Sequence, residues 1–275
     1  MHMKKALLYF VWFIALQLVG GAIMSFAWPL LGGDVKSPAY LITTTSLVNI
    51  VVIGVFLWTR AAELSPQWMR STRPWAALCW CCLAAFGAVI PSAFLQEQMP
   101  ELPNIVEKEF DMILGNRWGY VAIGLLAPLA EEIVLRGAIL RSLLRWTGSL
   151  PQDGTIPTSL TAGGPQRHGG HWTAIALSAL LFALMHFNPA QMPHAFLIGL
   201  LLGWMYWRTG SILPGVAYHW ANNTVAYVLY HFYPDPNLKI IDIFGSQRTV
   251  SAAILFSLFI LLPALYQLAL RLRRA

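Results

Sequence analysis

Two adjacent glutamates and an arginine, Glu131, Glu132 and Arg136, lie in the middle of an apolar segment of helical length, residues 125–140. The other ten acidic residues all lie in polar connections. A charge at a bilayer centre costs about 2.5–3.5 kcal/mol on insertion scales, so such residues persist where partners or chemistry compensate. Residues four apart share a helix face, whereas neighbours diverge by about 100°. We therefore expect a Glu132–Arg136 ion pair beside a working carboxylate at Glu131; the alternative is a charge cluster that only fixes helix packing.

Three further polar residues lie within apolar helical segments. His186 follows Phe182 by one helical turn, and His219 and Asn223 are four residues apart and share one face. A single intramembrane histidine often only bonds a neighbouring helix. A glutamate, two histidines and an asparagine on three separate helices together form a constellation that can activate water.

These three patterns resemble the motifs of the CPBP intramembrane proteases, the CAAX prenyl protease and bacteriocin-processing (Abi) family. The family pattern is Glu-Glu-x-x-x-Arg, then Phe-x-x-x-His, then His-x-x-x-Asn, and this chain carries all three in that order. The run from Gly199 to Pro214 also looks like the segment that such proteins place before the last motif. The resemblance covers residues 118–230, and the first three spans and the last carry no motif.

The resemblance implies an intramembrane endopeptidase that cleaves a peptide bond of a membrane-associated protein or peptide, with CAAX-type prenylated proteins as one substrate class. Such a reaction needs an activated water and donors for the oxyanion. Glu131 is the expected general base, and His186 is expected to help orient or deprotonate the same water. His219 and Asn223 are the expected oxyanion donors, and Glu132 and Arg136 support the geometry. Phe182 is expected to pack.

The same residues allow a second mechanism. Glu131, His186 and His219 could hold a catalytic zinc with an open fourth position. No His-Glu-x-x-His motif occurs in the sequence, and Glu-x-x-x-Arg is not a helical metal motif. We therefore favour a reaction without a metal cofactor.

A function from another class is a transporter or membrane scaffold that uses the buried glutamates and histidines as a proton or ion relay. The discriminating residue is Asn223 beside His219, because an oxyanion site needs this amide and a proton relay does not.

The composition predicts an all-α, polytopic membrane protein. Of 275 residues, 57% are hydrophobic and 11% are charged, and the mean hydropathy is +0.59; these values are typical of membrane proteins. The net charge of +6 does not indicate nucleic acid, because the basic residues occur in short clusters between apolar segments. We expect eight spans: 6–28, 40–58, 75–95, 118–146, 172–187, 195–207, 212–232 and 250–270.

The distribution of basic residues predicts the orientation of these spans. With both termini in the cytoplasm, twelve Lys and Arg fall inside and five outside, and Arg136 lies within the membrane. This bias follows the positive-inside rule. We expect one domain, 1–275, integral to a bacterial cell (inner) membrane, in contact with lipid and with its substrate but not with nucleic acid.

Two connections are long. Residues 96–111 are acidic and can form a short amphipathic helix over the bundle. Residues 147–171 are rich in Gly, Pro, Ser and Thr, which predicts a mobile loop.

Overall fold

The computed structural model describes residues 2–64, 74–150, 170–235 and 238–272. Within these ranges the chain is an all-α bundle without strands. Most of the connection 147–171, which we predicted to be a mobile loop, lies outside the described residues.

Helices occupy all eight predicted spans. They are α1 (His2–Leu30), α2 (Pro38–Trp58), α4 (Trp75–Glu97), a continuous helical run from Tyr120 to Trp146, α8 (Gly170–Leu184), α9 (Met192–Thr209), α10 (Leu213–Phe232) and α12 (Gln247–Arg271). Among the described residues, α1, α2, α4 and α12 are long and apolar enough to cross a membrane, and α8 is a shorter apolar helix. The protein is therefore a helical membrane bundle.

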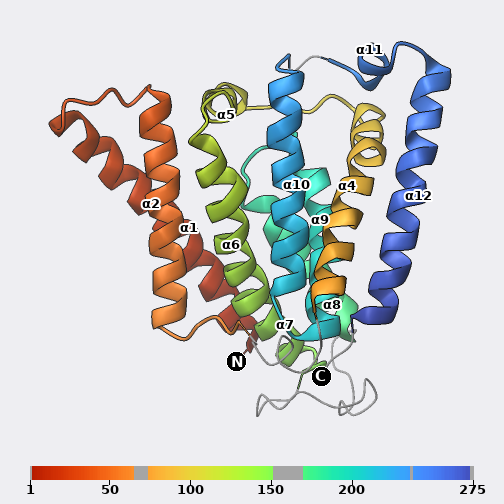
Figure 1. Ribbon diagram of the computed structural model, residues 1–275. Helices are drawn as coiled ribbons and strands as arrows, with labels where there is room; N and C mark the ends of the chain where they lie inside the picture. The colour runs from red at the N-terminus through yellow and green to blue at the C-terminus, as the bar shows by residue number, and fades with distance from the viewer. Residues whose placement is uncertain (1, 65–73, 151–169, 236–237, 273–275) are drawn as a thin grey trace.

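Two short helices lie at one end of the bundle, opposite the end where α1 begins and α12 ends (Figure 1). They are α5 (Glu107–Leu114) and α11 (Ile240–Phe244). The acidic connection 96–111 thus contains the beginning of the short amphipathic helix expected there. Asn188 anchors the rest of this connection, since its Nδ2 donates to Asn104 Oδ1 at 2.8 Å and its Oδ1 accepts from the Ile105 backbone N–H at 3.1 Å.

The run from Tyr120 to Trp146 is the central element (Figure 1). It consists of a π-helix η1 (Tyr120–Leu126), α6 (Ala127–Glu132), a second π-helix η2 (Ile133–Leu140) and α7 (Arg141–Trp146). Every residue of η2 is buried, and the run packs against α1, α2, α8 and α10. We expected one regular helix here; the sequence contains no signal for the two wide-turned segments, and such π segments are frequent at functional sites.

Glycines allow α8 and α9 to pack closely. A Cβ at Gly199 would lie 2.9 Å from Ala179 Cα, and a Cβ at Gly203 would lie 2.9 Å from Ile175 Cγ2. Two small residues four apart let membrane helices approach closely. This pair therefore fixes the position of α8, which leads into the turn that carries His186.

Candidate active site

The predicted ion pair lies at the centre of a buried network. Arg136 Nη1 donates to Glu132 Oε1 at 2.8 Å, and both side chains are fully buried. His219 Nδ1 donates to the same oxygen at 3.2 Å, across 87 residues of sequence. A carboxylate that accepts the Nδ1 proton fixes the tautomer and the orientation of an imidazole. Glu132 therefore holds His219 so that its Nε2 points away from the ion pair.

Gly215 makes room for this carboxylate. A Cβ on Gly215 would overlap Glu132 Oε2, so α10 can lie against the ion pair only with glycine at this position. Sequence analysis missed this residue, because it lies four positions before His219 with no polar group of its own.

Glu131 faces the other side of His219. Its Oε2 lies 3.7 Å from His219 Nε2, and its side chain is 16% exposed. This oxygen is buried, and it forms no hydrogen bond with any described residue. Glu132 Oε2 also lacks a hydrogen bond to a described residue, but it packs against Gly215 and does not line the cavity described below, whereas Glu131 does. Glu131 is thus the carboxylate of the adjacent pair that a bound molecule can reach.

His186 lies in a turn and not inside a helix, which corrects our expectation. Its Nδ1 donates to the Phe182 carbonyl at 2.8 Å. The helix α8 ends at Leu184, and Phe187 after it adopts a left-handed conformation (φ 49°) that cannot continue the helix. Pro189 acts in the same direction, because a proline disfavours helical geometry in the residue before it. This early end leaves His186 Nε2 without a hydrogen bond to a described residue.

Phe182 packs, as expected, and it contacts three members of the site. Its ring makes edge-to-face contacts with His186 (5.1 Å between centroids) and His219 (5.7 Å). The Arg136 guanidinium carbon lies 4.6 Å from the same ring centroid, a cation–π contact. One apolar side chain, 2% exposed, therefore positions both histidines.

Asn223 is tied to the central run. Its Nδ2 donates to the Ile123 carbonyl in η1 at 2.9 Å, and its Oδ1 accepts from Asn222 Nδ2 at 3.4 Å. A carboxamide nitrogen carries two hydrogens, so one N–H of Asn223 is left for another acceptor.

A cavity of about 410 Å³ brings these residues together. Glu131, His186, His219 and Asn223 all line it. Glu132 and Arg136 lie behind this wall. Seven polar residues that we had not predicted also contribute to the lining: Gln17, Thr45, Asn49, Gln96, Gln191, His194 and Asn222. His194 follows Pro193 in the first turn of α9; the only sequence signal for it was a histidine beside a helix-starting proline.

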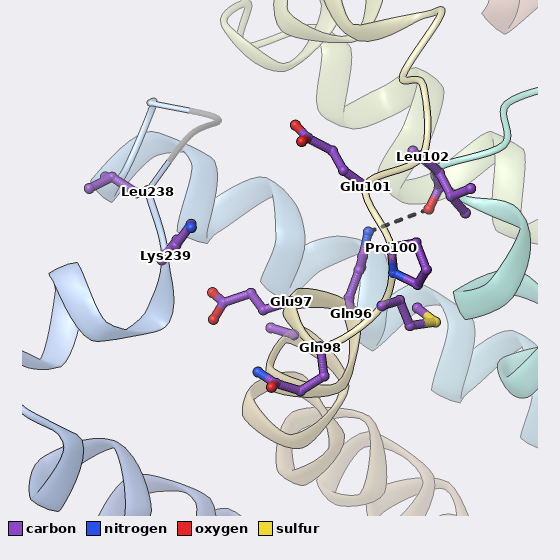
Figure 2. A pocket seen from close by; sticks show the side chains of 11 residues that line it. Gln96, Glu97, Gln98, Pro100, Glu101, Leu102, Leu238 and Lys239 are labelled. Atoms are coloured by element: carbon purple, nitrogen blue, oxygen red, sulfur yellow. Dashed lines mark hydrogen bonds between the residues drawn. The ribbon is translucent and has the colours of Figure 1, made fainter.

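A second hollow of about 640 Å³ lies beside the first, at the end of the bundle that carries α5 and α11. Its wall includes the acidic side chains Glu97 and Glu101, together with Lys239 (Figure 2). Gln96 lines both hollows and donates from Nε2 to the Ala190 carbonyl at 3.4 Å. No motif residue lines this outer hollow.

The zinc alternative requires three side chains that are grouped around one ion. Across the described ranges, no three His, Cys, Asp or Glu side chains are grouped so that they could hold one metal ion. Glu131, His186 and His219, the ligands of the zinc alternative, thus share a cavity without forming a ligand set, and we derive no step through zinc.

Comparison with known proteins supports the same class of enzyme. Residues 114–225 match the family described as type II CAAX prenyl endopeptidase Rce1-like. No curated protein and no solved structure matches the chain. The matched segment contains all three motifs and every catalytic residue that we predicted. The segment that carries the site, residues 114–225, therefore belongs to the CAAX prenyl protease (CPBP) family of intramembrane endopeptidases.

Proposed function

We propose that the protein hydrolyses a peptide bond of a prenylated, membrane-associated protein or peptide with a water activated by Glu131. The observation that carries this proposal is the meeting of Glu131, His186, His219 and Asn223 at one cavity. They come from α6, from the turn after α8, and from α10.

In the first step, Glu131 takes a proton from water while the water oxygen attacks the carbonyl carbon. His186 Nε2 accepts a hydrogen bond from the same water and orients it. The carbonyl oxygen becomes an oxyanion, which accepts hydrogen bonds from His219 Nε2–H and from the remaining N–H of Asn223. Such donors act mainly in the transition state.

In the second step the carbon–nitrogen bond breaks, and Glu131 returns its proton to the leaving amine. In the first step His219 donates from both ring nitrogens, Nδ1–H to the Glu132 carboxylate and Nε2–H to the oxyanion. Glu132 and Arg136 thus act through His219 and do not touch the substrate.

The test uses purified protein in lipid nanodiscs and a quenched fluorescent peptide that ends in a farnesylated CAAX sequence. We expect cleavage by the wild type and none by Glu131→Gln, which keeps the size of the side chain but removes the base. The matched control is Glu101→Gln in the outer hollow, which should cleave like the wild type. Cleavage by Glu131→Gln at more than a few per cent of the wild-type rate would refute the assignment of the base.

Metal content is measured on the same samples. We expect no stoichiometric zinc and full activity after exhaustive chelation. One zinc per chain, whose removal and return switch cleavage off and on, would overturn the mechanism without a metal cofactor.

The relay function is less well supported. A relay would pass through Glu131, His219, Glu132 and Arg136. Its last member, Arg136, lies inside the fully buried η2. The described residues that line the cavity lie in the middle of the bundle and at the end that carries α5. A relay needs access from both sides of the membrane. Proton flux into liposomes that contain the protein tests this alternative directly.

We place the protein in the inner membrane of a bacterial cell, as the resemblance implies for a chain of this size. Fractionation of cells that express the tagged protein tests this location.

A further inference from the structure

Three uncharged polar side chains from α1 and α2 line the same cavity as the motif residues. They are Gln17 on α1, and Thr45 and Asn49 on α2. Thr45 and Asn49 are four residues apart, so they lie on one face of the helix. None of the three side chains has a hydrogen-bond partner among the described residues, although Asn49 is only 3% exposed.

Asn49 is the most buried of the three, and packing alone does not explain its amide. The amide atoms are not among the fully buried unpaired atoms of the described residues, so they face the cavity, where no described side chain bonds them. A polar group taken out of bulk water without a bonded partner does not stabilise the fold. The other buried positions of α2 are apolar: Ile42, Val48, Val52 and Phe56. An apolar residue at position 49 would therefore serve the packing better, which indicates that the amide has a partner that is present only during function.

An intramembrane protease creates such a partner. A peptide bond can be attacked only after the chain around it is unwound, and in an apolar environment each unpaired backbone group then costs several kcal/mol. A carboxamide carries the same donor and acceptor as a peptide group, and a threonine hydroxyl can also donate and accept. Three neutral side chains of this kind match a substrate main chain, and they do not select for charge.

We propose that Gln17, Thr45 and Asn49 form a binding site for the main chain of the extended substrate segment beside the cleaved bond. This inference rests on the proposed function. It assigns a role to α1 and α2, which lie outside the matched residues 114–225 and carry no motif. The central run supplies the catalytic carboxylate, and the first two helices supply partners for the unwound peptide.

The test compares Asn49→Leu and Thr45→Val with a matched control, Thr44→Val. Thr44 is the neighbouring threonine; its hydroxyl is buried and unpaired, but it does not line the cavity. Cleavage of the farnesylated CAAX peptide should show a KM raised about tenfold for Asn49→Leu and less for Thr45→Val, with kcat nearly unchanged. Thr44→Val should match the wild type.

Melting temperature separates this role from a structural one. Asn49→Leu removes an unpaired buried amide, so the ligand-free protein should melt at the same temperature as the wild type or higher. A lower melting temperature would show that Asn49 supports the fold, and it would overturn the inference.

Binding of the same peptide is then measured by fluorescence anisotropy in Glu131→Gln, with and without Asn49→Leu. Weaker binding to the double variant supports the inference. This holds even if the wild type does not cleave this peptide, because that result contradicts only the proposed function. Cleavage by the wild type with equal KM in Asn49→Leu, or equal binding to the two Glu131→Gln proteins, overturns the inference and leaves the proposed function standing. N-methylation of the peptide beside the cleaved bond should weaken binding to Glu131→Gln more than to the double variant.

Discussion

At the scale of single residues, two adjacent glutamates have different environments because they leave the helix in different directions. Glu132 accepts from Arg136 and His219 in a fully buried network, whereas Glu131 lines the cavity. Helical spacing was sufficient to predict this division. It was not sufficient to predict the bond from His219 to Glu132, because spacing within a helix says nothing about which residue of a distant helix lies opposite.

Glu132→Gln should destabilise the protein before it affects the chemistry. The substitution leaves the Arg136 guanidinium buried without a counter-charge, and breaking a buried pair in this way typically costs about 3–5 kcal/mol. Expression level and melting temperature in detergent should both fall, with Glu131→Gln as the control that melts like the wild type. A Glu132→Gln protein that is stable but inactive would instead give Glu132 a direct chemical role.

Asn223→Ala should lower kcat by about 10²–10³ with little change in KM, since an oxyanion donor acts in the transition state. Steady-state cleavage of the farnesylated peptide measures both constants. Asn222→Ala is the control, because Asn222 lines the same cavity but bonds only Asn223 Oδ1. An effect confined to KM would contradict the assignment of Asn223.

At the scale of elements, hydropathy predicted where the helices lie but not how they end or how they are wound. The predicted span 172–187 was wrong at its end, since α8 stops at Leu184 and places His186 in a turn. The signal was present in Pro189, but the left-handed Phe187 was not readable from the sequence. The π-helices η1 and η2 depend on tertiary packing, so no local pattern indicated them.

Gly199→Ala should push α8 and α9 apart, because the added Cβ would contact the backbone of Ala179. Overpacking of this kind typically costs about 1–3 kcal/mol, and the shift would also move the turn that carries His186. We expect a lower melting temperature together with lower activity. Gly54→Ala on α2 is the control, since a Cβ there meets no atom within 4 Å; equal melting temperatures for the two variants would show that the contact between α8 and α9 can relax.

At the scale of the whole molecule, the cavity extends toward one end of the bundle. Gln96 at the end of α4 and the helix α5 line it, and both lie opposite the end where α1 begins and α12 ends (Figure 1). The positive-inside bias assigns the latter end to the cytoplasm. Together these features predict that the site is reached from the non-cytoplasmic side.

Labelling of intact cells tests this orientation. A cysteine introduced at Glu101, in the wall of the outer hollow, should react with a membrane-impermeant maleimide in a background where Cys79, Cys81 and Cys82 are replaced by serine. A cysteine at Lys5 should react only after the cells are opened. The reverse pattern would place the termini outside and the cavity toward the cytoplasm.

Gln96 lines both hollows, and its side chain is held by one hydrogen bond of 3.4 Å, which is beyond the usual range for such bonds. Every turnover consumes one water molecule and produces two fragments, and the apolar bundle offers few polar routes for either. A change of rotamer at Gln96 would reshape the wall that the two hollows share. The entry of water and the release of fragments would then depend on this motion.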